Sequence, residues 1–289
     1  MARNTVKTAM LLGALGGFLV LAGSLLAGRT GIVFGMTLGF AFVGGSWWFS
    51  DALAVRAAGA RPVEPGELAW LHATVKGLAS KASIPTPRLY ISPSPQPNAF
   101  ATGRSPNHAV VAVTEGLLSL LERSEVEAVI AHELAHVRHR DILLTSVAAA
   151  VATGISAVAH LASVALLFGG RNDQDGPSPL ATIAFVLVAP LAAGLLQLAL
   201  SRSRELEADR VGADLVGDGE PLARALERID IYASAIPMNI APAQAQAWIV
   251  NPLARHNLVA RLFSTHPPVA VRTALLRKKT VVACPNRVA

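Results

Sequence analysis

The chain has 289 residues, of which 52% are hydrophobic and only 15% charged, and its mean hydropathy is +0.46. This composition is too apolar for an ordinary soluble enzyme and predicts a membrane protein. The formal net charge of +6 comes without the aromatic and basic pattern of nucleic-acid binding, and a single cysteine, Cys284, excludes both an intramolecular disulfide and a cysteine-rich zinc module.

The first two predicted elements are apolar segments at residues 8–28 and 30–50, which carry no Asp, Glu, Lys or Arg. Each is long enough to span a bilayer. The second ends in Trp47-Trp48-Phe49, an aromatic cluster typical of the membrane interface. Buried core helices are the alternative, and the first segment could be a cleaved signal peptide. Segment length and the closely following second segment favour a retained transmembrane hairpin.

A short strand is predicted at residues 98–102, between a Pro-rich turn at 92–97 and a second turn at 103–107. Such a strand can pair with the extended backbone of a peptide, with specificity coming from side-chain pockets. The alternative is a strand with a structural role only.

The most informative stretch is His132-Glu133-Leu134-Ala135-His136, which has the form H-E-x-x-H. A helix is predicted here, because Ser124 and Glu127 match a capping box and the apolar residues after them recur at helical spacing. On a helix the two imidazoles share one face and can bind one zinc ion, while Glu133 stays free to accept a proton from water. A chance match is the alternative reading.

Two further uncharged segments, at residues 142–170 and 176–201, predict a second transmembrane hairpin. His160 lies inside the first of them and is interpreted as a neutral imidazole that faces the protein interior. Basic residues gather on one side of the four spans, which predicts a cytoplasmic location for both termini and for residues 51–141 and 202–289. They are Arg3, Lys7, Arg56, Arg61, Arg138, Arg140, Arg202, Arg204 and Arg210, against Arg29 and Arg171 on the other side.

A catalytic zinc ion needs a third protein ligand. The metzincin pattern is absent, since position 142 is Ile, and His139 is disfavoured as a ligand. The charged run after the fourth span lies on the correct side of the membrane. If helix continues from the spans, its carboxylates reach the same depth as the histidines. Within it Glu205 and Asp209 share a helix face while Glu207 points away, although a solvated charged face is an equal alternative for any one of them.

Two residues near the C-terminus complete the set of candidates. His266 precedes Pro267-Pro268, which suit the first turn of a helix, so its ring can hydrogen-bond an oxyanion or can simply cap or pack. Arg272 can offer a fork of hydrogen bonds to Asp209, or can be a surface arginine.

Four motifs in this order make the chain resemble the HtpX-type membrane zinc metallopeptidases, which have the eukaryotic CAAX prenyl-protein peptidases as distant relatives. The motifs are Pro97-Asn98-Ala99-Phe100-Ala101, the H-E-x-x-H stretch with Arg140-Asp141, Ser203-Arg204-Glu205-Leu206-Glu207-Ala208-Asp209, and Phe263-Ser264-Thr265-His266-Pro267-Pro268 with Arg272. The resemblance implies that the zinc ligands are His132, His136 and Glu205. It further implies that Glu133 is the base, that Asp209 supports a ligand, that His266 and Arg272 complete the site, and that Asn98, Ala99 and Phe100 bind substrate from an edge strand.

Together these features predict a mainly α polytopic membrane protein. Residues 1–50 and 142–201 form transmembrane hairpins, and residues 51–141 and 202–289 form a cytoplasmic zincin-like α+β catalytic domain with a short edge-strand sheet. The expected function is that of an endopeptidase of the bacterial inner membrane with one Zn²⁺ per chain. Its expected substrates are misfolded or membrane-embedded proteins, as in membrane-protein quality control. The alternative is a catalytically silent membrane scaffold or receptor, against which the intact Glu133 weighs.

Overall fold

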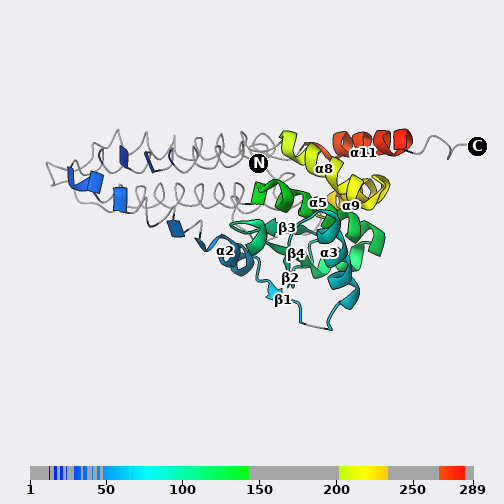
Figure 1. Ribbon diagram of the computed structural model, residues 1–289, viewed down its shortest axis with the longest axis horizontal. Helices are drawn as coiled ribbons and strands as arrows, with labels where there is room; N and C mark the ends of the chain where they lie inside the picture. Colours follow the sequence, from blue (N-terminus) through cyan, green and yellow to red (C-terminus); the bar gives the residue numbers. More distant parts are fainter. Residues whose placement is uncertain are drawn as a thin grey trace, which may run out of the picture.

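The computed structural model describes residues 48–64, 66–142, 202–233 and 267–283, together with scattered positions from 13 to 45. This part of the chain is mainly helical with one small sheet, as the sequence predicts (Figure 1). Its elements are α2 (Ser50–Ala57), β1 (Arg61–Pro62), α3 (Ala69–Lys81), β2 (Arg88–Ser92), β3 (Ala99–Thr102), the 3-10 turn η1 (Pro106–His108), β4 (Val110–Thr114), α4 (Glu115–Leu120), α5 (Arg123–His139), α8 (Arg202–Val216), α9 (Glu220–Ala233) and α11 (Val269–Ala283).

The four strands form one sheet in the order β1-β2-β4-β3. β2 and β4 are parallel, and the other two pairs are antiparallel. The sequence of β4, Val-Val-Ala-Val-Thr, is buried throughout, as expected for a strand covered on both faces. β3 pairs only with β4, so the strand predicted at residues 98–102 lies at the edge of the sheet.

The main core lies between one face of the sheet and the helices α3, α5 and α9 (Figure 1). α9 contributes Leu222, Leu226 and Ile229, which recur at helical spacing and are all fully buried. The opposite face of the sheet is covered by α2, where Phe100 and Ala112 pack against apolar residues of that helix. The sheet therefore holds β3 beside α5, and no other strand of the described residues pairs with the outer edge of β3.

The N-terminus of α5 differs from its prediction by two residues. The helix begins at Arg123, and the capping box is formed by Glu122 and Glu125 and not by Ser124 and Glu127. The Glu125 carboxylate accepts the backbone N–H of Glu122 at 3.0 Å and also receives Nη1 of Arg228 from α9 at 2.7 Å. This second partner comes from a distant helix, so the local pattern could not reveal it.

The C-terminus of α5 also departs from the prediction, because the helix does not run on unbroken from His136 toward residue 142. It ends at His139, and Arg140 adopts the left-handed conformation with φ 60° and ψ 28°. Few residues other than glycine adopt this conformation. The chain therefore turns sharply at Arg140, one residue before Asp141.

The predicted spans at residues 142–170 and 176–201 lie outside the described residues apart from Ile142, and His160 lies there too. Those at 8–28 and 30–50 are described mostly at scattered positions, of which each one from 13 to 45 is helical. Among the described residues, no helix combines the length and the apolar character that crossing a bilayer requires.

Candidate metal centre

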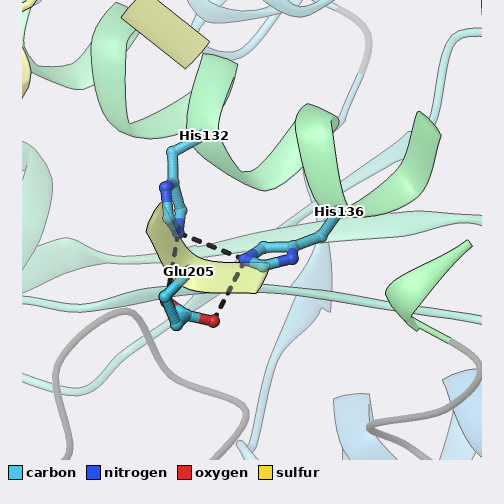
Figure 2. A group of neighbouring side chains, drawn as sticks. All are labelled: His132, His136 and Glu205. Atoms are coloured by element: carbon cyan, nitrogen blue, oxygen red, sulfur yellow. Dashed lines mark hydrogen bonds and ion pairs between the residues drawn. The ribbon is translucent and has the colours of Figure 1, made fainter. Parts of the chain in front are cut away.

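α5 supplies three polar side chains that lie deep in the protein. His132 and Glu133 are 1% and 3% exposed, and the side chain of His136 is 15% exposed. The two histidines lie one turn apart, so their rings converge on the same side of the helix (Figure 2). Their Nε2 atoms are 3.2 Å apart.

Glu205 of α8 completes a cluster of three donor groups with these histidines. One carboxylate oxygen lies 3.7 Å from Nε2 of His132, and the other lies 3.4 Å from Nε2 of His136. Ligand atoms bound to a tetrahedral zinc ion at about 2.0–2.1 Å stand about 3.3 Å from one another. The two imidazoles and one carboxylate could therefore hold a metal ion, and their spacing suits a tetrahedral one.

A close crossing of α8 over α5 brings Glu205 to the histidines. At the crossing point, a Cβ atom on Gly212 would lie 2.9 Å from the backbone nitrogen of His132 and 3.0 Å from its Cα. Ala135 and Ala208 are buried in the same contact. Small residues therefore let the two helices approach closely enough to share one cluster.

Asp209 lies one turn after Glu205 and contacts the other nitrogen of His132. Its Oδ1 is 3.0 Å from Nδ1 of that ring. Arg272 of α11 donates two hydrogen bonds to the same carboxylate, from Nη2 at 2.7 Å and from Nε at 2.8 Å. Burial alone would raise the pKa of Asp209, but the charge and hydrogen bonds of Arg272 outweigh it and hold this pKa well below its usual range. An ionised Asp209 favours the tautomer of His132 that leaves Nε2 free to bind a metal.

The shifted pKa values of His136 and Glu133 suit a cation-binding group and a general base, respectively. Burial alone would lower the pKa of His136, but Glu205 and Asp141 raise it to about 9, and a metal ion can replace the proton held there. Burial raises the pKa of Glu133 against the opposing charge of the histidines. The backbone N–H of Ala101 in β3 hydrogen-bonds to the Glu133 carboxylate, which places the edge strand directly beside the site.

Comparisons with known proteins identify the family of this chain. The sequence model of peptidase family M48 matches residues 65–280. This chain belongs to peptidase family M48. The protease HtpX homolog of Desulfatibacillum aliphaticivorans is 44% identical over 276 residues, which cover 94% of this chain and 89% of that protein. The protein of the same name from Burkholderia mallei (strain SAVP1) is 45% identical over 277 residues, with coverage of 94% and 96%. The resemblance to HtpX-type peptidases is confirmed.

A solved structure shares the M48 fold of this chain. The crystal structure of S. mikatae Ste24p superposes with a TM-score of 0.52 at 21% identity. The match covers 95% of this chain and 65% of that one, so this chain spans about two thirds of the length of Ste24p. At this identity the likeness concerns the fold alone.

The residues predicted to bind substrate lie on or next to β3, close to the candidate metal centre, and their side chains are buried. Asn98 and Ala99 are 0% exposed and Phe100 is 2% exposed. The backbone N–H and C=O of Asn98 both bond to Thr114, and Phe100 packs under α2. Substrate binding by this segment stays a prediction, and its burial favours a role for the backbone of β3 over one for these side chains.

The structure also bears on the other polar residues near the site. Arg272 is 1% exposed, so the alternative of a surface arginine is wrong. His266 lies outside the described residues, and His139 is not part of the donor cluster formed by the residues that the structure describes. Asp141 and Arg204 were given no role at the metal site by the sequence, yet both lie against it. The only signal for them was their place in motifs quoted for other residues.

Proposed function

We propose that this M48 protein is a zinc-dependent endopeptidase that hydrolyses peptide bonds of membrane or membrane-proximal proteins. The carrying observation is that Glu133 is buried beside a cluster of His132, His136 and Glu205 whose donor atoms are spaced as zinc ligands are. A scaffold would need the three ligands but not the neighbouring carboxylate. The retention of Glu133 therefore supports the enzyme over a silent scaffold.

The roles in hydrolysis follow from the positions of these groups. Zinc held by the two histidines and Glu205 would supply an activated water and a Lewis acid for the scissile carbonyl. Glu133 takes the proton from the attacking water, which its raised pKa favours, and then delivers it to the leaving amine. The free edge of β3 holds the substrate backbone as an added strand. His266 is proposed to donate a hydrogen bond to the oxyanion.

Metal analysis and a cleavage assay on the same detergent-purified protein test the proposal. The wild type is expected to contain one zinc ion per chain and to cleave casein or a membrane-protein substrate until a chelator is added. His132→Ala and His136→Ala should each lose both metal and cleavage, because two protein ligands hold zinc poorly. His108→Ala is the matched control, since His108 is an exposed histidine on η1. Full zinc occupancy in His132→Ala would mean that the site is wrong, and zinc without cleavage in the wild type would favour the scaffold.

We further propose that the protein is a multi-pass protein of the bacterial inner membrane with its active site in the cytoplasm. The support is the uncharged segments and the asymmetry of the basic residues. The quality-control role rests on the family resemblance. Single cysteines in a Cys284→Ser background test the topology with a membrane-impermeant thiol reagent on intact cells. Glu64→Cys and Asp214→Cys should be protected and Asp173→Cys labelled. Labelling of Asp214→Cys together with protection of Glu64→Cys would place the two halves of the site on opposite sides of the membrane and would exclude the proposed mechanism.

A further inference from the structure

A second carboxylate contacts the zinc-binding cluster on the side opposite Asp209. Oδ2 of Asp141 lies 3.4 Å from Nδ1 of His136, the ring nitrogen that faces away from Glu205. The Asp141 side chain is 3% exposed, so water does not compete freely for this contact. Its place matches that of Asp209 on the ring of His132.

The break in the helix at Arg140 creates this contact. In an unbroken helix, residues five apart point in directions about 140° apart, so Asp141 would face away from His136. The left-handed conformation of Arg140 ends α5 and redirects the next residue. A non-glycine residue is disfavoured in this conformation, so other contacts must outweigh its cost.

Arg204 of α8 faces the other oxygen of the same carboxylate. Its Nη1 lies 3.7 Å from Oδ1 of Asp141, and its side chain is 17% exposed. Each histidine is thus backed by an aspartate that an arginine holds: His132 by Asp209 with Arg272, and His136 by Asp141 with Arg204. The first chain is the tighter of the two, with a contact of 3.0 Å and a two-bond fork against 3.4 Å and a single long ion pair.

We propose that Asp141, held by Arg204, is a positioning residue that fixes the tautomer and orientation of His136 toward zinc. This inference rests on the proposed zinc site. A carboxylate that accepts the Nδ1–H of an imidazole leaves Nε2 as the metal ligand and makes it more basic. The pair also ties together the chain just before the predicted span at 142–170 and just after the one at 176–201. The orientation of His136 then depends on the contact between the segment at Asp141 and the segment at Arg204.

Zinc affinity and apo-protein stability, measured on the same full-length variants, test the proposal. Affinity is obtained by competition with a chelating zinc indicator, and stability from the melting temperature without metal. Asp141→Asn should weaken zinc binding about 10-fold, the lower end of the range for groups that support a metal ligand, because the contact is long. Asp209→Asn should lose more. The apo protein of Asp141→Asn should melt at a lower temperature than the wild type, because His136, whose pKa is raised to about 9, and Arg204 both lose a buried carboxylate. Leu226→Ala, a change in the buried core of α9, is destabilised without altering this contact and should bind zinc as the wild type does. Glu207→Gln is the matched control, since Glu207 also lies on α8 but forms an ion pair with Arg210 on the exposed side of the helix.

Arg204 is tested by a conservative and a disruptive change. Arg204→Gln should weaken zinc binding less than Asp141→Asn does, and Arg204→Lys should restore most of the loss because the charge returns. If Arg204 acts through Asp141, the double variant Asp141→Asn/Arg204→Gln should bind zinc no more weakly than Asp141→Asn alone. Fully additive losses would overturn the role of Arg204.

The result separates this inference from the proposed function. Wild-type affinity in Asp141→Asn, with zinc bound normally by the control, would overturn the role of Asp141 and leave the zinc site standing. A loss of zinc affinity in Leu226→Ala as large as that in Asp141→Asn would reduce Asp141 to a structural residue and also overturn the proposal. Absence of zinc from the wild type and from Glu207→Gln alike would instead overturn the proposed function, and this inference with it.

Discussion

Replacing Gly212 by alanine should damage the metal site more than it damages the fold. The added Cβ would lie 2.9 Å from the backbone nitrogen of His132, whereas carbon atoms in good contact stand about 3.5–4.0 Å from their neighbours. The contacted atoms of His132 belong to the backbone of α5 and cannot turn aside, so α8 must move away from α5 by roughly 0.5–1 Å. Overpacking of this kind costs about 1–3 kcal/mol, and the gain of about 1 kcal/mol from Gly to Ala in a helix offsets part of it.

The net loss of about 0–2 kcal/mol corresponds to a fall of only a few degrees in melting temperature. Glu205 lies two turns before Gly212 on the same face of α8, so the displacement carries its carboxylate away from the histidines. Zinc ligands tolerate errors of about 0.5 Å, and zinc affinity should therefore fall at least 10-fold together with cleavage.

Gly77→Ala is the matched control for this prediction. Gly77 lies inside α3, and a Cβ there would meet no atom within 4 Å. This change should raise stability by about 0.5–1 kcal/mol and leave zinc binding unaltered. The two variants are compared by chelator competition and by melting without metal. If Gly212→Ala binds zinc as tightly as Gly77→Ala does, the close crossing of α5 and α8 does not position the ligand.

Four further substitutions test the roles of individual groups at the site. Glu133→Gln should keep zinc but lose hydrolysis, since an amide cannot accept the water proton; near-normal turnover in the zinc-loaded variant would exclude this base. Glu205→Gln should release zinc while Glu207→Gln is nearly silent, and the reverse result in zinc titrations would show that the register of α8 is wrong. Asp209→Asn should weaken zinc affinity by roughly 10- to 100-fold, and an unchanged affinity would show that Asp209 does not orient His132 for metal binding. Arg272→Lys keeps the charge but not the fork and should destabilise the apo protein by about 1.5–3 kcal/mol, the worth of one hydrogen bond between charged groups; an unchanged melting temperature would contradict this.

The parts of the site that could be predicted from sequence are those that depend on local helix geometry. His132 and His136 converge because residues four apart share a helix face, and the same rule pairs Glu205 with Asp209 on α8. The edge position of residues 98–102 was implied by the family resemblance and is what the sheet order shows. These features survive errors of a residue or two in the helix ends, such as the misplaced capping box.

The parts that could not be predicted depend on a break in the pattern or on contacts between distant helices. Asp141 reaches His136 only because Arg140 leaves the helical conformation, and nothing in a sequence of ordinary helix formers marks such a break. The periodicity of α8 identifies its buried face but not the point at which it crosses α5. That point is at Gly212, where the absence of a Cβ atom lets the two helices approach closely. Likewise the two arginines that pair with Glu125 come from α9.

The division of the ligands between two helices gives the metal a role in stability as well as in chemistry. Residues 140–201 separate α5 from α8 in the sequence, yet the three proposed ligands and the two aspartates behind them connect these helices at one point. A metal that binds only the folded arrangement stabilises it by RT ln(1 + [L]/Kd), about 4 kcal/mol when free zinc is a thousandfold above Kd. Arg272 extends the connection to α11 through Asp209. Loss of zinc should therefore loosen α8 from α5 more than it loosens α11, since Arg277 of α11 also pairs with Glu220 and Glu227 of α9 and Leu276 packs into the main core.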